Sequence, residues 1–121
     1  MALYLGIDIG TSASKGVLID DRCNIVCQAS CGHETDNPCD GWYQHDAEAV
    51  WWGDFCRLSR ELVARSGVNA AQIGCVGLSA LGCDCVPVDT ECNALAPAIL
   101  YGVDARSKPQ IDELLSEYGS D

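Results

Sequence analysis

The sequence predicts an α/β fold that contains an antiparallel three-strand meander, a helix, a parallel strand, a short hairpin and a final helix. Within residues 3–9 apolar side chains occupy the odd positions, as in a strand with one buried face. A second stretch has apolar residues at helical spacing, at Trp51, Phe55, Leu58 and Leu62. The apolar run 73–79 follows that stretch, and an intervening helix favours parallel pairing of the strands on either side of it.

The predicted meander consists of residues 3–9, 15–20 and 24–30. A turn rich in glycine and hydroxyl residues joins the first two strands, and polar residues at 20–24 form the second turn. From residue 31 to 45 the chain is polar and interrupted by glycine and proline, so we expect a loop there.

The rest of the chain alternates between helix and strand. We expect the long helix to begin at an N-cap, Asp46, and to end at Gly67. Residues 73–79 then form a buried strand, and 85–89 pairs with 98–101 in a short hairpin. The final helix has Ile111, Leu114, Leu115 and Tyr118 at helical spacing, with Pro109 in its first turn.

Composition narrows the class of protein. With 121 residues and 48% hydrophobic residues, the chain has the size of one globular domain. Its net charge of −11 argues against nucleic acid and anionic membranes as partners. No apolar run approaches the roughly 20 residues that span a bilayer, and the first residues lack a basic signal region. We therefore expect a cytoplasmic protein.

Cysteine and histidine are interpreted as structural or solvated residues. Nine cysteines without a secretion signal favour reduced thiols, and we expect them to be small buried hydrophobic residues. The pair Cys83 and Cys85 keeps metal binding open as an alternative. His33 and His45 fall in the polar loop, where we expect both to be solvated.

The first turn has the residue types of a phosphate site. Gly10 allows close approach of a ligand to the backbone, and Thr11, Ser12 and Ser14 offer hydroxyl and N–H groups to an anion. Asp8, at the end of the first strand, suits Mg²⁺ bound through water. Lys15 is either a phosphate contact or a surface lysine. An ordinary hairpin turn is the alternative to the whole site.

These residues also carry a family resemblance. Asp8-x-Gly10-Thr11-Ser12-x-x-Lys15 resembles the first phosphate motif of the sugar kinase, actin and heat-shock chaperone superfamily. Three further stretches, 41–52, 73–79 and 95–106, are similar in order and spacing to the FGGY carbohydrate kinases of the xylulokinase and gluconokinase type. The resemblance implies an actin-like, RNase H-like ATPase fold. It also implies that residues 1–121 are a single partial domain, the amino-terminal part of domain I.

The resemblance implies a function as well. FGGY kinases transfer the γ-phosphate of ATP to a hydroxyl of a pentulose, hexulose or polyol, so ATP, Mg²⁺ and a sugar are the expected ligands. Asp8, Gly10, Thr11, Ser12 and Lys15 would bind the nucleotide, with Asp8 at the metal. The sugar would contact Asp84, Asp104 and Trp42. The family's general base lies beyond the matched region, so we expect the isolated chain to be inactive and to self-associate through its uncovered surface.

Two departures leave the substrate open. Residues 81–84 read Leu-Gly-Cys-Asp, where xylulokinase-like members carry Gln-Met-His-Gly and glycerol kinase-like members an Arg-Glu pair. Tyr101 stands where the family often has Trp. Two other functions remain as alternatives: a non-catalytic interaction or regulatory module of the same fold, and an activator ATPase whose cysteines bind an iron–sulfur cluster.

Overall fold

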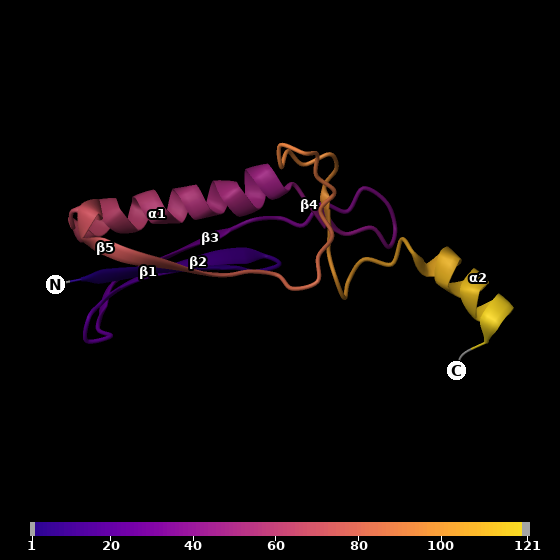
Figure 1. Cartoon of the computed structure of the whole chain (residues 1–121), viewed down its shortest axis with the longest axis horizontal. Coiled ribbons are helices and arrows are strands. Elements are labelled where there is room, and N and C mark those ends of the chain that lie inside the picture. Colours follow the sequence, from indigo (N-terminus) through magenta and orange to yellow (C-terminus); the bar gives the residue numbers. More distant parts are fainter. Residues whose placement is uncertain (1, 120–121) are drawn as a thin grey trace.

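The computed structural model describes residues 2–119 and contains a four-stranded sheet covered on one face by a long helix (Figure 1). The strand order is β3-β2-β1-β5, with β1–β2 and β2–β3 antiparallel and β1–β5 parallel. This confirms the predicted meander and the parallel strand. The elements are β1 Leu3–Ile9, β2 Ala13–Asp20, β3 Ile25–Gly32, β5 Ile73–Ser79 and α1 Gly53–Ser66.

A smaller set of elements lies beyond the end of the sheet (Figure 1). β4 Gln44–His45 pairs antiparallel with β6 Ala98–Ile99, and α2 Lys108–Tyr118 lies apart from the sheet. The predicted hairpin is present as two bridges, Cys85 with Ile99 and Val88 with Ala94. Its second strand also pairs with β4, inside the segment that we expected to be a loop. Between residues 2 and 119 no helix is long and apolar enough to cross a membrane.

The long helix begins and ends where the sequence predicts. The Asp46 side chain accepts a hydrogen bond from the Ala49 N–H at 2.9 Å. The first turns, Ala47–Trp52, are wide π-helical turns that lead directly into α1, and a short 3₁₀ helix, Ala70–Gln72, follows. Gly67 ends α1 in the left-handed conformation with φ of 67°.

The core lies between β1 and α1. Alternate residues of β1, from Leu3 to Ile9, are buried together with Leu18, Leu58 and Leu62. Gly16 of β2 faces the helix, and a Cβ atom there would lie 2.8 Å from Leu62 Cδ1. The missing side chain at Gly16 therefore sets how closely α1 approaches the sheet.

The predictions that β5 and the cysteines are buried are wrong. Val76 and Leu78 pair with buried residues of β1 but are 48% and 63% exposed, because no other element within residues 2–119 covers them. None of the nine cysteines is buried. Six are exposed, at positions 23, 39, 75, 83, 85 and 92. Several of these lie in turns or on β5, where the core does not reach.

The sequence Asp-x-x-Cys-Asn occurs twice and forms the same turn both times. In the turn at 20–24 the Asp20 carboxylate accepts hydrogen bonds from two backbone N–H groups and from the Asn24 side chain. Asp89 makes the corresponding bonds in the turn at 89–93. Cys23 and Cys92 have positive φ angles of 63° and 65°. The five-residue sequence Asp-x-x-Cys-Asn therefore specifies the same turn at both places through contacts among its own residues.

We expect Gly16→Ala to lower the free energy of unfolding by about 1–3 kcal/mol, because the new methyl group overlaps Leu62 and Ile7 in a packed core. Gly74→Ala in β5 is the matched control, since nothing lies within 4 Å of its Cβ position. Urea unfolding of the two variants and the wild type measures the difference. Equal stability of the two variants would contradict close helix–sheet packing at Gly16.

Candidate functional site

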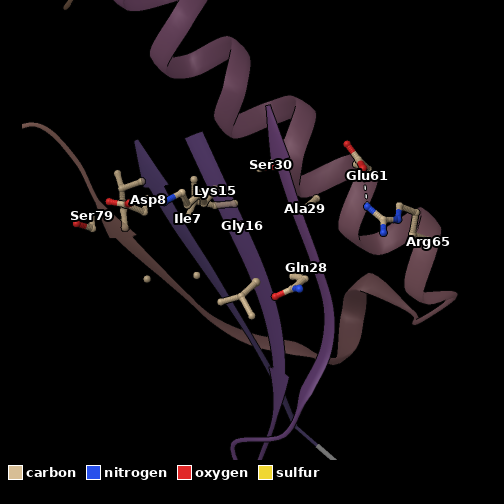
Figure 2. Close-up of a pocket in the computed structure, with 14 residues that line it drawn as sticks. Ile7, Asp8, Lys15, Gly16, Gln28, Ala29, Ser30, Glu61, Arg65 and Ser79 are labelled. Atoms are coloured by element: carbon tan, nitrogen blue, oxygen red, sulfur yellow. Dashed lines mark hydrogen bonds and ion pairs between the residues drawn. The ribbon is translucent and has the colours of Figure 1, made fainter. Parts of the chain in front are cut away.

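The turn after β1 is tight and places Asp8 at an exposed edge. The Gly10 N–H donates to the Ala13 carbonyl at 3.1 Å, and a Cβ on Gly10 would lie 2.9 Å from that same oxygen. Glycine is therefore required at the start of the turn. Asp8 is exposed, and the strand registers place it between Lys15 of β2 and Ser79 of β5 (Figure 2).

An open hollow of about 940 Å³ follows these strands, lined in part by Asp8, Lys15 and Ser79. Gly6 and Gly77, which have no side chains, line it further along β1 and β5. The Asp8 carboxylate faces solvent, so a metal ion or a phosphate can reach it. A carboxylate turned into the apolar core could not be reached. Thr11 and Ser12 are exposed in the turn beside it.

Behind this turn lies a buried carboxylate, Asp54 of α1. It accepts a hydrogen bond from Ser14 Oγ at 2.7 Å and contacts His33 Nδ1 at 2.7 Å. Ser14 is fully buried, so the expectation that its hydroxyl faces an anion is wrong. The other ring nitrogen of His33 lies 3.0 Å from the Gly10 carbonyl oxygen. The His33 side chain is only 7% exposed, so the prediction that it is solvated is wrong. It is buried because Asp54 gives it a charged partner inside the protein.

Asp54 stays ionised despite its burial. Desolvation favours the neutral acid, but hydrogen bonds from Ser14, His33 and Cys31 outweigh it and hold the pKa of Asp54 below its usual value. The pKa of Cys31 shifts in the opposite direction, because partial burial and the neighbouring carboxylate raise the pKa of its thiol to about 11. The Cys31 side chain is therefore a neutral thiol beside a charged aspartate.

His45 forms a second buried contact with the turn. Trp51 Nε1–H donates to His45 Nδ1 at 2.9 Å, and His45 Nε2 lies 3.2 Å from Thr35 Oγ1. Thr35 Oγ1 in turn donates to the Thr11 carbonyl at 3.1 Å. His45 is 1% exposed, so it too was wrongly predicted to be solvated. Burial, and then the nearby His33, lower the pKa of His45 and favour its neutral form.

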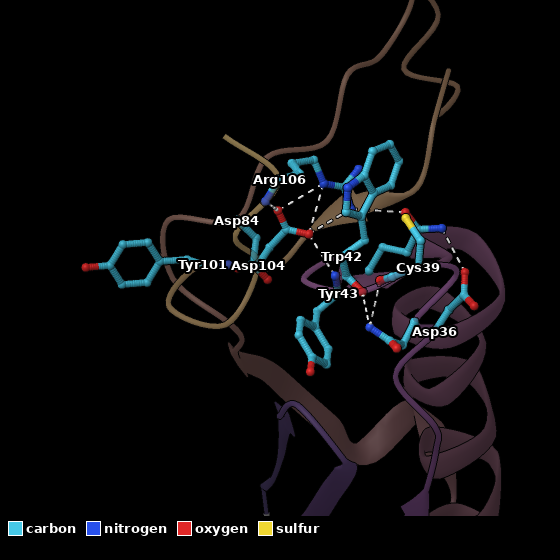
Figure 3. A network of polar contacts seen from close by, with 10 residues as sticks. Asp36, Cys39, Trp42, Tyr43, Asp84, Tyr101, Asp104 and Arg106 are labelled. Carbon is cyan, nitrogen blue, oxygen red and sulfur yellow. Dashed lines mark hydrogen bonds and ion pairs between the residues drawn. The ribbon is translucent and has the colours of Figure 1, made fainter. Parts of the chain in front are cut away.

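A second polar cluster lies among the loops beyond the sheet (Figure 3). Arg106 Nε donates to both oxygens of Asp104 at 2.9 Å, and the Tyr43 N–H donates to the same carboxylate at 2.7 Å. The Arg106 guanidinium lies 4.2 Å from the centre of the Trp42 ring. The hydrogen bond from Arg106, assisted by that from Tyr43, lowers the pKa of Asp104 to about 2.

Asp84 is less completely bonded than Asp104. Its Oδ1 atom accepts from the Tyr101 N–H at 2.7 Å (Figure 3), while its buried Oδ2 atom has no hydrogen-bond partner among residues 2–119. Arg106 Nη2 also donates to Gln44 Oε1 at 3.1 Å. Residues 42–45 thus contact both this cluster and, through His45, the turn after β1.

The structure brings the predicted residues together in two groups. Asp8 and the turn that follows it form the first group, and Trp42, Asp84 and Asp104 fall among the loops of the second. Sequence reasoning missed His33 and Asp54, which are separated by 21 residues and carry no shared motif. The partner role of Arg106 was also missed, although Arg106 lies in the stretch that resembles the family.

Comparison with known proteins decides the family. A family model described as the N-terminal domain of the FGGY family of carbohydrate kinases matches residues 3–121. The chain belongs to the FGGY carbohydrate kinase family. Its fold is accordingly that of the actin-like kinases, as the resemblance implied.

Individual FGGY relatives show how much of a kinase the chain represents. It is 29% identical to a glycerol kinase of Trichormus variabilis over 111 residues, which are 91% of this chain and 22% of that protein. A crystal structure of a xyloylose kinase from Brucella ovis aligns with a TM-score of 0.83 and 32% identity, covering 95% of this chain and 24% of that one. The Plasmodium falciparum glycerol kinase with ADP aligns with a TM-score of 0.81 and 25% identity, over 98% and 24%. The chain thus spans about a quarter of the length of these FGGY kinases.

We expect the Arg106–Asp104 contact to weaken in acid. The folded pKa of about 2 lies below the usual value of about 3.9, so the contact is complete above about pH 4 and is lost as the pH falls through 2. An NMR titration should then show the Trp42 indole signal moving with a midpoint near 2. Trp52, which stacks on Phe55 at 5.3 Å, is the internal control. Asp104→Asn should abolish the acid shift, and a midpoint near 4 would contradict the strong contact.

Proposed function

We propose that this chain carries the phosphate-binding part of an ATP-dependent carbohydrate kinase. The enzyme transfers the γ-phosphate of ATP to a hydroxyl of a pentulose, hexulose or polyol. The observation that carries the proposal is an exposed carboxylate, Asp8, beside a hydroxyl-bearing turn that is held firmly from behind. We further propose that residues 1–121 form the amino-terminal part of domain I and are inactive alone, because the general base lies elsewhere in the enzyme.

The residues of the turn fit a magnesium nucleotide. Mg²⁺ is commonly held by one or two carboxylates together with phosphate oxygens and water, and Asp8 supplies one exposed carboxylate. Thr11 and Ser12 offer hydroxyl and N–H groups to the terminal phosphates, and Gly10 leaves room for their approach. Lys15 adds a positive charge across the strand pair from Asp8. ATP supplies the phosphoryl group, while these residues bind and orient its negatively charged phosphates.

The loop cluster is the proposed sugar side. A buried carboxylate oxygen without a partner is costly, and a sugar hydroxyl is a suitable donor for Asp84 Oδ2. Trp42 is 40% exposed and provides an aromatic face of the kind that packs against sugar rings. Asp104 holds Arg106 against Trp42, so its contribution to sugar binding includes fixing that face.

We also propose that the protein is cytoplasmic and that the isolated chain self-associates. The support for self-association is uncovered apolar surface on two elements. On β5, Val76 and Leu78 are exposed, and on α2 Ile111, Leu114 and Leu115 are about half exposed. Surfaces of this kind are normally covered by another part of a protein.

A kinase assay of the full-length gene product tests the proposal. With ATP and Mg²⁺, we expect phosphorylation of at least one member of a panel of pentuloses, hexuloses, gluconate and glycerol. Asp8→Asn should lower kcat by about 100-fold or more, because a charge that stabilises the transition state is lost. The charge-matched control is Asp21→Asn, in the exposed turn at the far end of β2. Nucleotide binding without turnover of any sugar would favour the non-catalytic module instead.

A further inference from the structure

Three consecutive carbonyl groups of the turn after β1 are bonded to one short segment, residues 33–35. The Gly10 carbonyl contacts His33 Nε2 at 3.0 Å. The Thr11 carbonyl accepts from Thr35 Oγ1 at 3.1 Å, and the Ser12 carbonyl accepts from the backbone N–H of His33 at 3.1 Å. The segment after β3 therefore holds the whole turn from its inner side.

This contact determines which way the N–H groups of the turn point. In a trans peptide the carbonyl and the following N–H point in opposite directions. Since the carbonyls of Gly10, Thr11 and Ser12 point toward residues 33–35, the N–H groups of the next residue in each case point away from that segment. Successive N–H groups on one side of a turn make an anion-binding nest. Residues 33–35 thus orient the nest.

His33 has hydrogen-bond acceptors at both ring nitrogens. Nδ1 faces the Asp54 carboxylate and Nε2 faces the Gly10 carbonyl, and neither group has a proton to give when Asp54 is ionised. A ring that donates to both acceptors carries a proton on each nitrogen, which is the imidazolium form. The other titratable groups near it are His45, whose ring lies 5.0 Å away, and Cys31, the neutral thiol beside Asp54.

The contact through Thr35 is made by neutral groups. Trp51 Nε1–H can only donate, so His45 Nδ1 accepts and Nε2 carries the single proton of a neutral ring. That proton goes to Thr35 Oγ1, and the Thr35 hydroxyl proton goes to the Thr11 carbonyl. The turn is therefore held at the Thr11 carbonyl by a neutral chain of donors through Thr35, and at the Gly10 carbonyl by His33.

We propose that His33 is a positioning residue for nucleotide binding: as an imidazolium held by Asp54, it fixes the Gly10 peptide so that the N–H nest faces the phosphates. His33 reaches the turn only from its inner side and does not touch the nucleotide. The inference rests on the proposed function, because the N–H nest has a role in binding only if the turn binds the phosphates of a nucleotide.

A matched pair of variants in the full-length kinase separates the two bonds of His33. The amide nitrogen of Asn occupies the place of Nδ1, so His33→Asn keeps a donor toward Asp54 and loses the one toward Gly10. His33→Gln does the reverse. Both remove the imidazolium charge. We expect His33→Asn to raise the Kd for Mg-ATP about 10-fold or more, as misplacement of a binding group does, and His33→Gln to stay within about 3-fold.

The outcomes distinguish this inference from the proposed function. A wild-type protein that fails to bind Mg-ATP overturns the proposed function and the inference with it. Wild-type binding with equal losses in the two variants overturns the inference alone, because it shows that only the charge or the fold mattered. Imidazole ¹⁵N NMR of the wild type is independent of variant folding. Protons on both ring nitrogens of His33 at neutral pH are expected, and a single proton overturns the inference.

Discussion

The buried carboxylate of Asp54 joins the three parts of the molecule that meet behind the turn after β1. It comes from α1, and it binds Ser14 of β2 and His33 after β3. A buried charge is tolerated only where opposite charge and hydrogen bonds offset its desolvation, so these partners and Asp54 require one another. The contact also requires α1 to lie close to β2, which the missing side chain at Gly16 permits. The close packing at Gly16 and the buried contacts of Asp54 therefore depend on the same approach of α1 to β2.

The arrangement links both candidate sites to one stretch of chain. His45 of β4 contacts the turn through Thr35, and the neighbouring Gln44 accepts a hydrogen bond from Arg106. Because β4 pairs with β6, the loop that carries Arg106 begins from the same short ladder. A kinase must hold phosphate and acceptor hydroxyl in fixed relation for phosphoryl transfer. In the proposed kinase, residues 42–45 would set that relation within this part of the enzyme.

Features encoded by short-range patterns could be predicted from the sequence. The alternation of β1, the Asp46 cap, the Gly67 end of α1 and the turn after β1 depend on residues a few positions apart. His33 was mispredicted because its burial depends on Asp54, which is distant in sequence and joined to it by no periodic signal. Val76 and Leu78 show the converse: an apolar strand pattern predicts burial, but burial needs a covering element that the strand itself does not encode.

The two candidate sites differ in how far their polar groups are satisfied by the protein itself. At the turn, the carbonyls of Gly10, Thr11 and Ser12 all have partners, so the backbone is preorganised before any ligand arrives. At the loop cluster, Asp84 keeps a buried oxygen without a partner within residues 2–119, and it belongs to the segment 81–84, whose sequence departs from both patterns that the family carries there. A fixed turn suits a constant ligand such as a polyphosphate. In the proposed kinase, the unsatisfied oxygen of Asp84 would be the acceptor on which the identity of the sugar depends.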